Sequence, residues 1–168
     1  MVSKIVLQAL FGNPAMMEAP WTLRAQVIWL TLLAFTTVAA SFDGRERRIP
    51  NAWNLSGAVT FLGLQVWFGL YISAFVAVFL TGLVMLLPTL YQVWGQGDWK
   101  MAMVYGAALG VLPTLVIWWL ALFLLKVYST VVKKFKVRWL QMDTKSGMPV
   151  AVFVLLATIL FFAALFLM

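Results

Sequence analysis

The most constraining feature of the chain is a stretch from Ala52 to Trp94 in which no residue is charged. A helix that crosses the hydrocarbon core of a bilayer needs about 20 predominantly apolar residues, and this stretch is about twice that length. It therefore predicts two membrane-spanning helices that turn near Gly69–Ser73. Pro88 falls inside the second helix, where membrane proteins tolerate a kinked helix.

Composition extends this prediction to the whole chain. Hydrophobic residues make up 64% of the 168 residues and charged residues only 10%, which leaves too little polar surface to cover a soluble globule of this size. We therefore expect an all-α integral membrane protein whose main partner is the lipid bilayer. The net charge of +7 is concentrated in short loops between apolar segments, where it orients the chain in the membrane, so no nucleic-acid partner is predicted.

The distribution of basic residues sets the number of spans. The first span is predicted from about Arg24 to Phe42 and the last from about Met148 to Leu167, with Ser146 as its N-cap and Pro149 in its first turn. Between them, the apolar run from Met101 to Leu125 has the length for one tilted helix, but a break at 110–113 places ten basic residues on one side of the membrane, as the positive-inside rule requires. These residues are Arg45, Arg47, Arg48, Lys100, Lys126, Lys133, Lys134, Lys136, Arg138 and Lys145.

The resulting topology has about six spans with both termini outside. The fourth span, from about Asp98 to Leu109, is too short to cross unaided and needs shielding by its neighbours. Residues 1–21 are predicted to form an amphipathic segment at the membrane surface, and residues 22–168 a single membrane-embedded domain.

Asp43 and Asp98 are the candidate catalytic residues. Each lies at the end of a long apolar run in a chain with only five acidic residues, and an ionisable group near bilayer depth marks a pathway or a reaction site by default. The predicted topology places both at the same depth on the same side. Taken singly, Asp43 is equally compatible with a solvated turn and Asp98 with a helix N-cap.

Carboxylates are also the main catalytic chemistry that the chain retains. It has no cysteine and no histidine, which excludes thiolate metal sites, the usual zinc and di-iron sites and Ser-His catalysis, so neither a metal nor a cofactor is predicted. Two adjacent carboxylates that share a proton can hydrolyse a peptide, one taking a proton from water and the other polarising the carbonyl. Helix dipoles favour Asp98 as the base and Asp43 as the acid, unless one of the nearby arginines folds back onto Asp43.

The strings around the two aspartates resemble those of the type IV prepilin peptidase family, membrane aspartic proteases with a Gly-x-Gly-Asp motif. An aspartate, a short basic run and Ile-Pro-Asn correspond to residues 43–51, and the second motif corresponds to Gly95, Gly97, Asp98 and Lys100, with Gln96 in place of the usual middle glycine. The glycines are expected to let the backbone bend and an extended substrate approach. A proline-containing element before the last span is matched only loosely by residues 147–149.

The resemblance covers residues 22–168 and implies the activity. The chain is similar to the short, peptidase-only members that serve tight-adherence (Flp) pili, because it has no room for the methylating domain of larger members. The implied substrate is a prepilin or pseudopilin, whose leader would be cut after a glycine at the cytoplasmic face of the inner membrane.

Two other classes remain as alternatives. A small proton- or ion-coupled transporter could use Asp43 and Asp98 as carriers, although both acids lie at one face and no inverted repeat is visible. A non-catalytic assembly protein that kept the fold would be favoured only by loss of an aspartate, and both are present.

Overall fold

The computed structural model describes residues 2–12, 22–135 and 149–167, and all of its regular structure is helical. In these residues the helices are α1 (Val2–Phe11), α3 (Leu23–Glu46), α4 (Asn51–Trp67), α5 (Tyr71–Leu90), α6 (Gln96–Leu109), α7 (Val111–Phe135) and α8 (Val150–Leu167). The expected all-α fold is confirmed. Several residues named above lie outside the described ranges: part of the predicted surface segment (13–21), the basic residues Lys136, Arg138 and Lys145, and residues 146–148.

Each segment that was predicted to span the membrane contains a helix. In the described part of the chain, α3, α5, α7 over Val111–Val132 and α8 are long and apolar enough to cross a membrane. The chain is therefore a multi-pass membrane protein. Whether the shorter helices α4 and α6 also cross, which would make six spans, stays a prediction.

Local sequence explains where the helices end. Thr22 caps α3 by accepting the N–H of Ala25, at 3.2 Å. Gly69 and Gly110 have positive φ angles of 72° and 91°, which glycine adopts without strain, and each lies between two consecutive helices. The predicted turn after α4 and the predicted break after α6 are therefore confirmed, and Pro88 lies inside α5 as expected.

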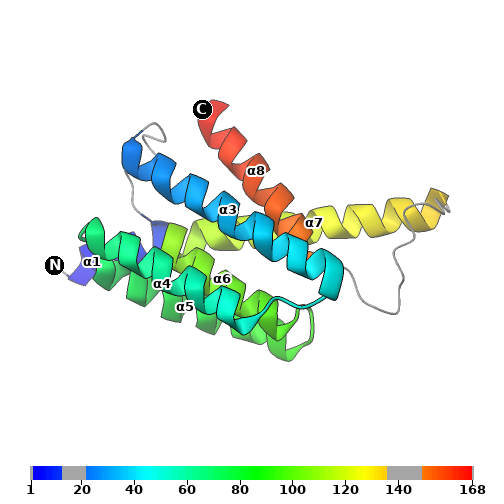
Figure 1. Ribbon diagram of the computed structural model, residues 1–168, viewed down its shortest axis with the longest axis horizontal. Helices are drawn as coiled ribbons and strands as arrows, with labels where there is room; N and C mark the ends of the chain where they lie inside the picture. The colour runs from blue at the N-terminus through cyan, green and yellow to red at the C-terminus, as the bar shows by residue number, and fades with distance from the viewer. Residues whose placement is uncertain (1, 13–21, 136–148, 168) are drawn as a thin grey trace.

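The helices pack as two groups (Figure 1). Contacts are dense among α4, α5 and α6, with α1 against α5, and dense again where α8 packs between α3 and α7. Contacts from one group to the other are fewer. Because α3 and α6 carry the two candidate aspartates, Asp43 and Asp98 belong to different groups.

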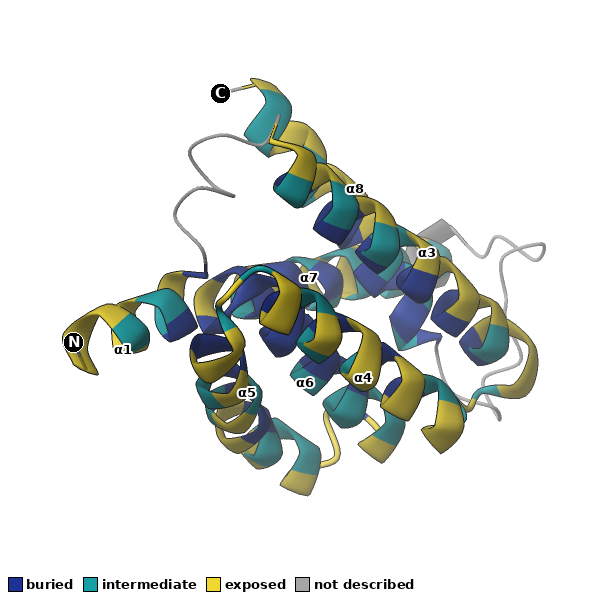
Figure 2. Cartoon of the chain, turned by 60° about the vertical axis from the view of Figure 1, so that its left-hand side comes forward, coloured by how far each residue is buried: buried dark blue, intermediate teal, exposed yellow. Residues whose placement is uncertain are grey.

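Burial follows the pattern of a bundle that lies in lipid. The inner faces are closed by large side chains such as Trp29, Phe61 and Trp118, each no more than 1% exposed. The outer faces carry large apolar side chains that are mostly exposed, among them Phe79 and Trp119, and Figure 2 shows this exposed layer along the outside of the helices. Such an apolar exterior is the surface that lipid tails cover.

Helix α1 contributes a close contact at the far end of α6. Gly12, which follows α1, packs so tightly against the backbone of Leu109 and Gly110 that neither glycine has room for a side chain. Ala9 is fully buried and packs with Ala77 and Val111. The helix is thus attached to α5 and α7, and its position relative to the membrane surface stays a prediction.

Candidate active site

Asp43 is held in the last turn of α3, with 7% of its surface exposed. Its Oδ2 accepts the backbone N–H of Ala151 in the first turn of α8, at 2.8 Å. The peptide dipoles of a helix favour negative charge at this position, so the start of α8 stabilises the Asp43 carboxylate. Arg47 has an αL conformation that ends α3, and its charge lies within electrostatic range of Asp43.

Asp98 occupies the first turn of α6. Its Oδ2 accepts the N–H of Gly95, the residue that caps this helix, at 3.1 Å. Burial, followed by the nearby charge of Asp43, raises the pKa of Asp98 to about 7, while the Gly95 N–H acts in the opposite direction. Near neutral pH this carboxyl group is therefore available as a proton donor.

The two aspartates line one cavity of about 300 Å³. Arg47, Arg48 and Lys100 line it as well, and Lys100 Nζ donates to Asn51 Oδ1 at 2.8 Å across its wall. A broader hollow of about 1,090 Å³ also includes both aspartates and has an apolar side formed by residues of α5, α7 and α8 and by the loop before α6. The arrangement presents two carboxyl groups, several cations and an apolar wall to a single space.

The segment before Asp98 is held in place from α4. Asn54, which is 4% exposed, donates its Nδ2–H to the carbonyl oxygen of Gly97 at 3.3 Å. The backbone at Gly95 has φ −77° and ψ 164°, a conformation open to any residue, and a Cβ there would meet only Asp98 Oδ2 at 3.5 Å. The backbone angles therefore do not require glycine at position 95. Of the two roles expected for this glycine, bending of the backbone and access for a substrate, only access remains.

Comparison with known families agrees with this geometry. A family model described as the type IV leader peptidase family matches residues 30–132, a range that includes both aspartates and the other residues named above that line the cavity of about 300 Å³. The chain belongs to the type IV leader peptidase family. Searches of curated proteins and of solved structures returned no match.

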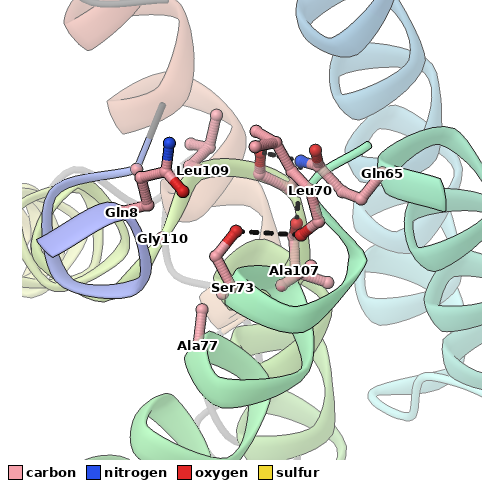
Figure 3. Close-up of a pocket in the computed structure, with 12 residues that line it drawn as sticks. Gln8, Gln65, Leu70, Ser73, Ala77, Ala107, Leu109 and Gly110 are labelled. Carbon is pink, nitrogen blue, oxygen red and sulfur yellow. Dashed lines mark hydrogen bonds between the residues drawn. The ribbon is translucent and has the colours of Figure 1, made fainter. Parts of the chain in front are cut away.

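A leader peptidase requires a site that can admit a peptide, and a second cavity in the structure does not meet this requirement. Figure 3 shows the cavity near the C-terminal end of α6, where Gln65 Nε2 donates to the carbonyl oxygens of Ala107 and Ala108 at 3.1 and 3.2 Å. Its volume is about 10 Å³, room for about one water molecule. The cavity with the aspartates, at the other end of α6, is the larger of these two.

Two features of the candidate site were not predicted from the sequence. The contact between Ala151 and Asp43 joins residues 108 positions apart, and only the proline before the last helix hinted that this helix start had a role. Asn54 is one uncharged residue in a long apolar stretch. The sequence indicated a role for it only because a buried amide needs a hydrogen-bond partner.

Proposed function

We propose that the protein is an aspartic endopeptidase that removes the leader peptide from type IV prepilins or pseudopilins, with Asp43 and Asp98 as its catalytic residues. Membership of the type IV leader peptidase family supports a membrane peptidase with a prepilin-type substrate. The observation that carries the aspartic mechanism is that α3 and α6 bring their aspartates to one cavity.

The surroundings of the two carboxyl groups favour a division of roles. Burial opposes the charged form of both carboxyl groups, but Asp43 accepts the N–H at the start of α8 and also lies near Arg47, so we assign Asp43 the ionised form, which takes a proton from the attacking water. Asp98, with a pKa of about 7, supplies the proton that polarises the scissile carbonyl and then stabilises the leaving amine. This reverses the assignment drawn from the helix ends in the sequence, which could not include the start of α8.

The broader hollow suits the substrate class. A prepilin has a basic leader followed by an apolar helix, and the apolar side of the hollow offers a surface for that helix next to the carboxyl groups. The basic residues around the aspartates, including Arg45, Arg48 and Lys100, support a cytoplasmic orientation of this end by the positive-inside rule. We therefore propose cleavage at the cytoplasmic face of the inner membrane.

The test is cleavage of a co-expressed prepilin in membranes by the wild type, Asp43→Asn and Asp98→Asn. Glu46→Gln is the matched control, because Glu46 lies in the same turn of α3 as Asp43 but is exposed to solvent. We expect both aspartate variants to insert normally and to lose cleavage, while Glu46→Gln retains it. Cleavage by either asparagine variant would refute the catalytic assignment.

The transporter alternative gains no support from the structure. Asp43 lies in the last turn of α3 and Asp98 in the first turn of α6, so we expect both at one boundary of the membrane rather than near the bilayer midplane, where the substrate and ion sites of transporters usually lie.

A further inference from the structure

Three buried hydroxyl groups join the helices that build the active site. Tyr105 Oη lies 2.6 Å from Thr36 Oγ1 and 2.8 Å from Thr158 Oγ1, and all three residues are fully buried. Thr36 is on α3, Tyr105 on α6 and Thr158 on α8. We call these residues the hydroxyl triad.

Each residue of the hydroxyl triad lies seven residues along its helix from a residue of the candidate active site. On α3, Thr36 precedes Asp43 by seven residues; on α6, Tyr105 follows Asp98 by seven; on α8, Thr158 follows Ala151, the donor to Asp43, by seven. Seven residues make about two helical turns, so each pair shares a helix face at a separation of roughly 10 Å along the axis. The triad therefore lies two turns from Asp43 on α3, two turns from Asp98 on α6, and two turns from Ala151, the donor to Asp43, on α8.

This location matters because the aspartates belong to different helix groups. Asp98 is on α6, which packs mainly on α4 and α5, whereas Asp43 is on α3, which packs mainly on α8. A slide or rotation of α6 against α3 and α8 would change the separation of the two carboxyl groups. The triad links α6 to both α3 and α8 by directional hydrogen bonds, which resist such a movement more than apolar contacts do.

We propose that the hydroxyl triad is a positioning device that holds α6 in register against α3 and α8 and thereby sets the separation of Asp43 and Asp98. Its catalytic consequence rests on the proposed function. The triad residues do not touch the substrate; they act through the helices that carry the aspartates.

The number of hydroxyl protons in the triad shows which substitution tests it with the least disturbance. Thr36 and Thr158 each also contact a carbonyl oxygen of their own helix at 2.7 Å, that of Leu32 and that of Val154. Three hydroxyl protons therefore serve four contacts. In Tyr105→Phe both threonines can donate to their own helices, so this variant removes the links between helices without leaving a buried donor unpaired.

The experiment compares the kinetics of prepilin cleavage by the wild type, Tyr105→Phe and Thr114→Val. Thr114 is the matched control, since it is fully buried and donates to the Gly110 carbonyl oxygen of its own chain segment at 2.7 Å but is not part of the triad. Because small misplacements of reacting groups are costly, we expect Tyr105→Phe to lower kcat about tenfold or more with little change in KM, and Thr114→Val to resemble the wild type. A correctly inserted Tyr105→Phe with wild-type kcat would overturn the proposal.

A second measurement does not depend on activity. The chain has no cysteine, so Asp43→Cys combined with Asp98→Cys reports the separation of the two positions by its yield with a short thiol cross-linker. We expect Tyr105→Phe to lower that yield, and an unchanged yield would overturn the proposal. A lowered yield in a protein whose wild type cleaves no prepilin would support the positioning role and refute the proposed function.

If Tyr105→Phe does not accumulate in membranes, Thr36→Val and Thr158→Val provide the same test. Each removes one link and leaves the Tyr105 hydroxyl group its other partner. We expect a smaller loss of kcat and of cross-linking in each, and wild-type values in both would contradict the positioning role.

Discussion

The sharpest prediction concerns the alkaline limb of the pH–rate profile. If Asp98 is the proton donor, cleavage requires its protonated form, so activity falls as pH rises through the pKa of about 7. One pH unit above the pKa only about a tenth of the molecules retain the proton, and two units above only about a hundredth. A pKa at the ordinary value for aspartic acid would instead leave almost no active enzyme at neutral pH.

Gly95→Pro tests the cause of this limb. The Gly95 N–H donates to Asp98 and stabilises its anion, and proline lacks that N–H while its ring suits the observed φ of −77°. A hydrogen bond to a charged group contributes about 1.5 kcal/mol at the lower end of its range, which suits an exposed donor. At about 1.4 kcal/mol per pKa unit, its loss should raise the pKa of Asp98, and move the alkaline limb, by about one unit.

The assay is cleavage of a detergent-solubilised prepilin between about pH 5 and 10, with kcat/KM fitted at each pH. Gly95→Ala is the control, because it keeps the N–H and places its Cβ in ordinary contact with Asp98 Oδ2, at 3.5 Å. Its alkaline limb should stay close to that of the wild type. A limb that does not move in Gly95→Pro, or that moves equally in both variants, would refute the reasoning about this hydrogen bond.

Two further predictions concern stability and the support of the site. Gly106→Ala would force a Cβ against the side chain of Thr81, so it should lower the free energy of unfolding by about 1–3 kcal/mol. The control is Gly63→Ala, whose Cβ would meet nothing within 4 Å and which should be neutral or stabilising. Equal melting temperatures of the two variants would contradict this. Asn54→Ala should lower kcat severalfold, because it frees the Gly97 carbonyl beside Asp98. The corresponding rise in activation free energy should exceed the loss in free energy of unfolding, which cleavage kinetics and a melting curve of the same sample would show.

The helices could be predicted from the sequence because their causes are local or one-dimensional. A charge-free stretch twice the length of one span must turn, and it does so at Gly69, which takes a positive φ. The break at Gly110 was predicted from the positive-inside rule, which requires the basic loops to lie on one side of the membrane. This rule concerns the whole chain, but it uses only the positions of basic residues in the sequence. The aspartates stood out because an acid beside long apolar runs requires a reason.

The arrangement around those aspartates was decided only by tertiary structure. The electrostatic environment of Asp43 depends on the start of α8, which the chain reaches 108 residues later. Arguments from the two helix ends that carry Asp43 and Asp98, made without α8, therefore favoured the reverse of the acid and base roles that we propose. The hydroxyl triad could not be seen either, since a threonine or tyrosine in an apolar helix is common and its partners lie 69 and 53 residues apart along the chain.

The sequence by itself thus determined that this is a helical membrane protein, that its chain turns at Gly69 and Gly110, and which two acids are the catalytic candidates, because hydropathy, loop charge and backbone preference act on neighbouring residues. Tertiary structure decided that Asp43 and Asp98 face one cavity, which N–H groups their carboxylates accept, and which buried hydroxyl groups join α3, α6 and α8. These depend on the register between helices that are distant in sequence, and register is set by side-chain packing in three dimensions.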